Sequence, residues 1–395
     1  MNLVRALKAL LLVLRQQCGA TLVRLPSGQH PVVILDQEGA DVIKPLLPDF
    51  GHIVLSVRGE SLYFSPKIVA RTLRNLTRLR NPLAAYSLAV IETVRPRLVI
   101  TLIDNSGIYH AIRRFCPHIN FVAIQNGARC VKRDNSDGSP IRHDHFVCFG
   151  RAHEEAYRTF GAHVDHYHPL GSLRDAFYRE TFKRPANIEY DLCLISEVEP
   201  ELAQLHPRLW QGIELLARHL ARYCKESGCR IGIAMRADRV ANAEQFFFEE
   251  EFFKTTFAGT EYTMIGNVRA QFRSYRAVDS SRLSLSVYST LGLESFGRGN
   301  RTLFFNATGL DDYDPPERGL WTLDEPGYAE FQSRVDQMLT MSDEDYLENQ
   351  KYAAPRLMAV LHTPLLQGPL RKLIVELADN NRPSLAGRKS NQITL

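Results

Sequence analysis

Short apolar runs alternate with helix-compatible stretches along most of the chain. In the first half these runs occupy residues 31–35, 52–56, 98–103, 121–125 and 145–149. Most of them end in polar or small residues, and several of the intervening stretches carry apolar side chains at helical spacing. This alternation predicts a parallel sheet with helices on both faces.

The alternation weakens between residues 171 and 190 and then resumes. New apolar runs occupy residues 191–196, 230–235, 283–287 and 302–306. The stretch after the first of them places four apolar side chains on one helical face, namely Ile213, Leu216, Leu220 and Tyr223. From residue 328 to 378 the pattern is helical.

This pattern predicts an α/β protein with two Rossmann-like, doubly wound domains that face each other across a cleft. The expected boundaries are 31–170 for the N-terminal domain, 171–190 for a linker, 191–325 for the C-terminal domain and 326–395 for a helical C-terminal cap.

Residues 1–30 stand apart as a predicted amphipathic helix. Leucines share one face and basic residues lie largely off it (Leu3, Leu7, Leu10, Leu11, Leu14; Arg5, Lys8, Arg15). Such a helix either packs as the first helix of the domain or lies on an anionic membrane surface. No apolar run in the sequence approaches the roughly 18 residues that cross a bilayer. We therefore expect a cytoplasmic protein. If the helix lies on a membrane surface, the protein would contact the cytoplasmic face of the inner membrane peripherally.

Composition narrows the class of protein. The 395 residues suffice for two domains, and 45% hydrophobic with 23% charged residues is ordinary globular composition. A net charge of +4 is too small to indicate nucleic-acid binding but is compatible with an anionic substrate. The seven cysteines are scattered without a C-x-x-C pair, which suggests neither a disulfide framework nor a zinc site and fits a reducing cytoplasm.

Polar residues follow two predicted strands of the first half, where parallel α/β sheets bind ligands. Asp104 and Asn105 begin one such cluster, and Gln125 and Asn126 form the other. The functional interpretation makes Asp104 a carboxylate in the cleft, available as general base or nucleophile. The structural alternative is a helix cap for the first cluster and a simple turn for the second.

The turn at Ser289 and Thr290, which precedes a short predicted helix and the strand at 302–306, is the most distinctive candidate for a ligand-binding site. Ser289 and Thr290 stand at a predicted helix N-terminus, where free N–H groups and the helix dipole bind phosphate. Glu294 falls one turn further, where a carboxylate can reach a ribose hydroxyl. The alternative is a tight strand–helix turn with Glu294 on a solvated face.

Several motifs of other enzyme classes are missing from the sequence. There is no G-x-G-x-x-G after the first strand, no P-loop, no D-x-D at a strand end and no G-x-S-x-G elbow. Once these enzyme classes are set aside, the sequence still predicts a cleft between two lobes that contains hydroxyl groups, an acid and arginines. Such a site is suited to the metal-free transfer of a sugar from a nucleotide-activated donor, because positive groups and helix dipoles can stabilise the departing phosphate. We expect no metal and no cofactor.

Five blocks of the sequence, in order, resemble the bacterial surface carbohydrate biosynthesis proteins. The blocks are residues 102–109, 123–129, 191–196 and 275–281, running into 289–294. These proteins look like GT-B glycosyltransferases and are distantly similar to transferases that use CMP-activated 3-deoxy-octulosonic acid (Kdo). The resemblance covers roughly residues 31 to 310.

The resemblance implies roles for individual residues. The donor would be bound by the C-terminal domain, through Ser196, Arg236, Ser289, Thr290, Gly292 and Glu294. The N-terminal domain would supply the acceptor side of the cleft, through Asn105, Ser106, His110, Gln125, Asn126 and Arg129. The catalytic carboxylate is expected to be Asp104, with Glu197 and Asp238 as the next candidates.

We therefore expect a metal-independent glycosyltransferase of surface polysaccharide or lipopolysaccharide biosynthesis. It would pass an acidic or deoxy, Kdo-like sugar from a nucleotide donor, most simply a CMP-sugar, to a glycan or lipid-linked glycan. Two alternatives remain: a nucleotide-sugar epimerase of the same fold, and a non-catalytic glycan-binding or assembly protein.

Overall fold

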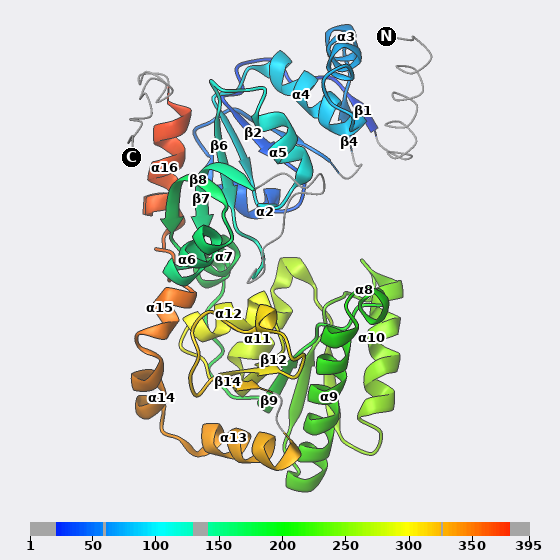
Figure 1. Ribbon diagram of the computed structural model, residues 1–395, viewed down its shortest axis with the longest axis vertical. Helices are drawn as coiled ribbons and strands as arrows, with labels where there is room; N and C mark the ends of the chain where they lie inside the picture. Colours follow the sequence, from blue (N-terminus) through cyan, green and yellow to red (C-terminus); the bar gives the residue numbers. More distant parts are fainter. Residues whose placement is uncertain (1–20, 58–60, 129–140, 325–326, 380–395) are drawn as a thin grey trace.

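The computed structural model describes residues 21–57, 61–128, 141–324 and 327–379, which form two α/β lobes (Figure 1). Each lobe is built on a six-stranded sheet in which all paired strands are parallel. The predicted fold of two doubly wound, Rossmann-like domains is confirmed. The predicted N-terminal helix and Arg129 lie outside the described residues.

The N-terminal sheet has the strand order β3-β2-β5-β6-β7-β8. Its strands are β2 (Val32–Leu35), β3 (His52–Leu55), β5 (Leu98–Thr101), β6 (Asn120–Ile124), β7 (Arg142–Cys148) and β8 (His163–Pro169). Strands β2 and β5 are buried at every position because helices cover both faces of the sheet. This double coverage explains why the central strands appear in the sequence as unbroken apolar runs.

Two hydrophobic cores cover the two faces of the N-terminal sheet. Around them lie α2 (Ala40–Ile43), α3 (Pro66–Asn75), α4 (Pro82–Val94), α5 (Gly107–Arg113) and α6 (Arg151–Thr159). A small two-stranded sheet pairs β1 (Thr21–Val23) with β4 (Ser61–Tyr63). Asn81 begins α4 by accepting hydrogen bonds from two N–H groups of its first turn.

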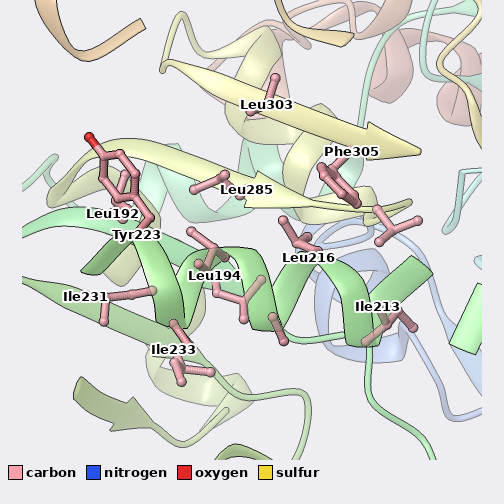
Figure 2. Packing of buried hydrophobic residues seen from close by; sticks show 14 of the residues in the cluster. Leu192, Leu194, Ile213, Leu216, Tyr223, Ile231, Ile233, Leu285, Leu303 and Phe305 are labelled. Atoms are coloured by element: carbon pink, nitrogen blue, oxygen red, sulfur yellow. The ribbon is translucent and has the colours of Figure 1, made fainter. Parts of the chain in front are cut away.

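The C-terminal sheet has the strand order β11-β10-β9-β12-β13-β14. Its strands are β9 (Tyr190–Ile195), β10 (Ile231–Ala234), β11 (Tyr262–Ile265), β12 (Ser281–Ser286), β13 (Thr302–Asn306) and β14 (Thr322–Asp324). The helices are α8 (Leu202–Leu205), α9 (Pro207–Ser227), α10 (Ala243–Thr256), α11 (Arg273–Asp279) and α12 (Thr290–Gly297). Figure 2 shows α9 packed on this sheet, and Ile213 and Leu216 of the helix belong to the same hydrophobic core as Leu194 and Leu285 of the strands. The predicted apolar face of α9 is confirmed.

Two segments connect the lobes. The stretch 171–190, for which the sequence predicts a linker, contains helix α7 (Leu173–Thr181). Its start packs in the N-terminal core, whereas Tyr178 packs against Phe272 and Tyr275 of the C-terminal lobe. Because one helix contributes to both cores, it fixes the two sheets against each other.

The described C-terminal segment is helical and returns to the first lobe. It comprises α13 (Tyr328–Thr340), α14 (Asp343–Gln350), α15 (Ala353–Leu357) and α16 (Pro369–Ala378). Leu370, Ile374 and Leu377 of α16 belong to the core that covers one face of the N-terminal sheet. Figure 1 shows this helix beside the upper lobe, although the chain has already completed the lower one. Within the described residues we find no helix with the length and apolar character needed to cross a membrane.

Candidate functional site

A cavity of about 560 Å³ lies at the carboxyl edge of the C-terminal sheet, against the N-terminal lobe. The ends of β9 and β10 supply its floor, and the turn before α12 supplies one wall. The N-terminal lobe contributes Gly127 and Ala128. The lining also includes Ser196, Glu197, Glu199, Glu201, Arg236, Asn267, Ser274, Tyr275, Tyr288, Ser289, Thr290 and Tyr313. The cavity is therefore built from both domains.

The predicted turn at Ser289 forms one wall of this cavity. The Ser289 hydroxyl caps α12 by accepting a hydrogen bond from the Leu291 N–H at 3.2 Å. The Thr290 hydroxyl oxygen accepts a hydrogen bond from the Ala128 N–H at 2.9 Å. Two blocks that the sequence separates by 162 residues thus meet across the cleft.

Glu197 holds the backbone of the same turn. Its carboxylate accepts hydrogen bonds from the N–H groups of Val287 at 2.7 Å and Tyr288 at 2.8 Å. Burial raises the pKa of Glu197 to about 7, although these backbone bonds and Arg236 favour the charged form. The residue lines the cavity, but its position suits shaping the turn better than attacking a substrate.

A buried carboxylate supports the floor of the cavity from behind. Glu249 of α10 is fully buried and accepts a hydrogen bond from the Arg236 N–H at 2.9 Å. Gln245 donates to Glu249 at 3.0 Å, and the Ser196 side chain is a further hydrogen-bond partner. Burial raises the pKa of Glu249. The Arg236 guanidinium itself pairs with Glu199 in the cavity.

Glu249 was not among the site residues predicted from the sequence. Three consecutive glutamates, at positions 249 to 251, look alike in the sequence. The available signal was helical spacing, because Glu249 shares the core-facing side of α10 with Phe246 and Phe253.

A second cavity of about 250 Å³ adjoins the first, and the two share Asn267 and Tyr275. Its remaining lining is Glu38, Leu102, Asn126, Arg174, Arg269 and Phe272. Arg269 of the C-terminal lobe donates to both carboxylate oxygens of Glu38 at 2.7 Å, which closes this space across the cleft. Arg174 lies 3.7 Å from Glu38 and 3.3 Å from Asp41. Glu38 was not among the residues predicted from the sequence, although it follows the strand at 31–35 as Asp104 follows the strand at 98–103.

Glu294 lies beneath the cavity and does not line it. Its carboxylate is 2% exposed and accepts hydrogen bonds from the hydroxyls of Ser172 at 2.5 Å and Tyr275 at 2.6 Å. Burial, followed by the charge of Asp175, raises the pKa of Glu294 to about 7. In this conformation Glu294 joins α7 to the C-terminal lobe through Ser172, so both of its oxygens are already engaged by protein hydroxyls.

Gly292 also contributes through packing. A Cβ atom at this position would lie 2.7 Å from the Ser286 hydroxyl oxygen and 3.1 Å from the Phe304 ring. Glycine therefore lets α12 lie close to β12 and β13, and this close approach places Ser289 and Thr290 at the cavity wall.

Most of the predicted N-terminal residues lie behind the cleft surface. Asp104 is 1% exposed and accepts a hydrogen bond from the Tyr157 hydroxyl at 3.0 Å. Gln125 is equally buried and accepts from the Phe149 N–H at 3.1 Å. Neither side chain lines either of the two cavities described above. Asn126 does line the second cavity.

The remaining candidates have local structural roles. Ser106 caps α5, and the His110 ring contacts the backbone oxygen of Asp104 at 3.1 Å. Asn105 is exposed and lies outside the lining of both cavities. Asp238 accepts hydrogen bonds from two N–H groups of its own loop, which lowers the pKa of its carboxyl group. In the part of the chain that the structure describes, no group of three or more His, Cys, Asp or Glu side chains is placed to hold a metal ion.

The fold resembles that of several solved nucleotide-sugar enzymes. A "putative UDP-N-acetylglucosamine 2-epimerase" from Listeria monocytogenes is 13% identical, with 85% of this chain and 94% of that one covered and a TM-score of 0.55. A glycosyltransferase from Rickettsia africae is 11% identical, with 90% and 100% covered and a TM-score of 0.51. HepE from Anabaena, solved with UDP-glucose, is 12% identical, with 87% and 99% covered and a TM-score of 0.50. At these identities the likeness concerns the fold, which is the two-domain arrangement of GT-B glycosyltransferases and related epimerases.

No curated protein matches the sequence. A family model described as "putative O-antigen biosynthesis protein" matches residues 122–360, which is more than half of the 395 residues. The matched region runs from β6 of the N-terminal sheet to the segment after α15, so it includes both sides of the larger cavity. The chain belongs to this family of O-antigen biosynthesis proteins.

Proposed function

We propose that this protein is a metal-independent glycosyltransferase of O-antigen or related surface polysaccharide assembly. It takes a sugar from a nucleotide donor bound in the larger cavity and transfers it to a glycan or lipid-linked glycan that enters from the N-terminal side. The observation that carries the proposal is the composite cavity, in which the Thr290 turn of one lobe receives a hydrogen bond from Ala128 of the other.

The larger cavity suits a nucleotide. Its volume of about 560 Å³ lies within the usual range of small-molecule sites. The N-terminus of α12 offers backbone N–H groups and a positive dipole end to a phosphate. The Ser274 hydroxyl is 6% exposed, lines the cavity and has no hydrogen-bond partner among the described residues. A buried hydroxyl in this situation gains a partner when a polar ligand binds.

The charges around this cavity favour a donor with one phosphate. Three carboxylates line it, those of Glu197, Glu199 and Glu201, against the single guanidinium of Arg236. A CMP-sugar carries one phosphodiester charge, whereas a UDP-sugar carries two and meets more repulsion from the same carboxylates. This balance supports a CMP-activated donor.

The adjoining cavity supports an acidic sugar. Arg174 and Arg269 line it together with Tyr275, which also lines the larger cavity. A sugar carboxylate can replace Glu38 as the partner of these guanidinium groups, because bidentate pairing with a carboxylate is the geometry that Arg favours. A Kdo-like sugar meets this requirement.

Glu38 is our first candidate for the carboxylate that acts on the acceptor. It lines the cavity between the lobes, whereas Asp104 is buried and bonded to Tyr157. A general base must come within hydrogen-bond distance of the acceptor hydroxyl, and Glu38 reaches that position once its pair with Arg269 opens.

Nucleotide binding by the purified full-length protein tests the donor site. In isothermal titration calorimetry we expect CMP to bind at least about tenfold more tightly than UDP. Ser274→Ala should weaken CMP binding about tenfold, the value of one hydrogen bond to a charged group. Ser227→Ala, at the far end of α9, is the matched control and should leave binding unchanged. Tighter binding of UDP would reject the CMP donor and keep the transferase, while no binding of either nucleotide would favour a non-catalytic assembly protein.

Measuring the products of turnover distinguishes a glycosyltransferase from an epimerase. We expect release of free CMP from a CMP-sugar to require a glycan acceptor. A product in which the sugar changes while it stays attached to the nucleotide, with no acceptor present, would identify an epimerase instead.

The two candidate carboxylates are compared by isosteric substitution. We expect Glu38→Gln to abolish transfer while CMP still binds, because general-base catalysis contributes about 10²–10⁴-fold. Asp104→Asn is the comparison. Wild-type turnover in Asp104→Asn removes Asp104 from the role, and wild-type turnover in Glu38→Gln removes Glu38.

A further inference from the structure

Two cysteines of the C-terminal lobe lie against each other at the end of α9. The sulfur atoms of Cys224 and Cys229 are 2.8 Å apart, and both are free thiols. Bonding would require them to approach by only about 0.8 Å, because a disulfide is about 2.05 Å long. Their spacing, with four residues between them, matches no recognised motif, so the pair is not apparent from the sequence.

The backbone brings the pair together. Helix α9 ends at Gly228, which has φ +69° and donates its N–H to the Cys224 carbonyl at 2.8 Å. This left-handed residue reverses the chain, so that Cys229 returns over the last helical turn. The Cys229 N–H also contacts the Ser227 hydroxyl at 3.4 Å. The approach of the two sulfur atoms is therefore a property of a capped helix end.

The two thiols differ in access and acidity. Cys224 is 3% exposed and packs in the core beside the residues of Figure 2, whereas Cys229 is partly exposed to solvent. The two sulfur atoms share a hydrogen bond, and this contact with Cys224 lowers the pKa of the Cys229 thiol. An accessible thiol of lowered pKa with a second thiol in contact is the arrangement of an attacking and a resolving cysteine.

The other described cysteines lack this arrangement. Cys116, Cys148 and Cys193 are all buried, and burial raises the pKa of each thiol to about 12. They serve as internal comparisons for reactivity.

We propose that Cys224 and Cys229 are a site of reversible disulfide formation. The Cys229 thiolate attacks a low-molecular-weight disulfide, whose S–S bond breaks and releases one thiolate. The Cys224 sulfur gives its proton to that thiolate, attacks the Cys229 sulfur and expels the second thiol. Two protein thiols are oxidised, one small disulfide is reduced to two thiols, and the end of α9 becomes covalently joined to the residue preceding Arg230 and β10.

The pair is remote from the proposed nucleotide site. Residues 224–229 precede β10, whose opposite, carboxyl end leads to Met235 and Arg236 in the larger cavity. Oxidation of the two cysteines should therefore leave CMP binding unchanged. A failure of this proposal can thus be distinguished from a failure of the proposed function.

Oxidised glutathione is the probe. The full-length protein carries Cys18→Ser and Cys130→Ser, because those two cysteines lie outside the described residues. It is reduced, freed of reductant, treated with oxidised glutathione and alkylated. We expect a mass decrease of about 2 Da, for two hydrogen atoms, in a cross-linked peptide containing residues 224 and 229, reversible with dithiothreitol. Cys116, Cys148 and Cys193 should stay reduced.

Single substitutions assign the two roles. In Cys224→Ser we expect a lasting glutathione adduct on Cys229, and in Cys229→Ser we expect Cys224 to stay reduced. Circular dichroism checks that both variants fold; if one does not, peptide mapping of the parent protein decides alone. Alkylation of both cysteines after oxidation, or an adduct that persists on Cys229 while Cys224 is present, would overturn the proposal.

Discussion

The stability of this protein should depend on the ionisation of Glu294, which links α7 to α12. Its carboxyl group is 2% exposed, and burial moves its pKa from 4.5 to about 7. A shift of this size corresponds to about 3 kcal/mol of free energy. Replacement by glutamine keeps the shape of the side chain and removes the charge.

The sign of the effect follows from proton linkage. Between pH 4.5 and 7 the native protein keeps a proton on Glu294 that the unfolded chain has lost. The free energy of unfolding therefore falls as the pH rises through this window, and the loss is complete above about pH 7. In Glu294→Gln this loss is absent. The difference in unfolding free energy between variant and wild type should shift by about 3 kcal/mol in favour of the variant from pH 4.5 to pH 8.

Urea unfolding followed by circular dichroism at several pH values measures this difference. Glu244→Gln, at an exposed position of α10, is the matched control and should change stability by no more than about 0.5 kcal/mol. If the difference between Glu294→Gln and wild type is the same at pH 4.5 and pH 8, Glu294 is ionised in the native state at both pH values and the reasoning is wrong.

Two further substitutions probe the packing behind the site, each measured by urea unfolding. Gly292→Ala should destabilise the protein by about 1–3 kcal/mol, since the added methyl group overlaps side chains of β12 and β13. Gly266→Ala, where a Cβ meets nothing nearer than 3.7 Å, should be nearly neutral. Arg298→Met should cost about 3–5 kcal/mol, because it leaves the buried Asp279 without its ion-pair partner and leaves Asp175 with Arg179 alone. Arg222→Met removes an exposed ion pair of α9 and should leave the free energy of unfolding nearly unchanged, so equal losses for the two arginines would contradict the role of burial.

The strands most accurately predicted from the sequence are those in the middle of each sheet. Strands β2, β5 and β13 are buried at every position, so each appears as a largely apolar run. The edge strand β8 was missed because its residues are partly exposed and alternate histidine with other polar and aromatic side chains. As an edge strand, β8 pairs with one neighbour, β7, and its own sequence need not be apolar.

The site was predicted in outline and less well in its individual residues. The Ser289–Thr290 turn was recognisable because a capping residue followed by a helix is a local feature, and the structure places it at the cavity. Asp104 looked equally suitable as an acid after a strand, but it is 1% exposed and its carboxylate accepts a hydrogen bond from Tyr157. Glu38 also follows a strand, but nothing local in the sequence distinguishes it from the other acids in loops.

The sequence by itself determined the two-domain α/β architecture, the central strands and the helix cap at Ser289, because each depends on residues close together in the chain. Only the tertiary structure decided which polar side chains face the cleft. Glu294 is paired with Ser172, 122 residues away, and Glu38 with Arg269, 231 residues away. The exposure, charge and partners of a carboxylate depend on such distant neighbours, and these are set by how the two lobes pack around α7.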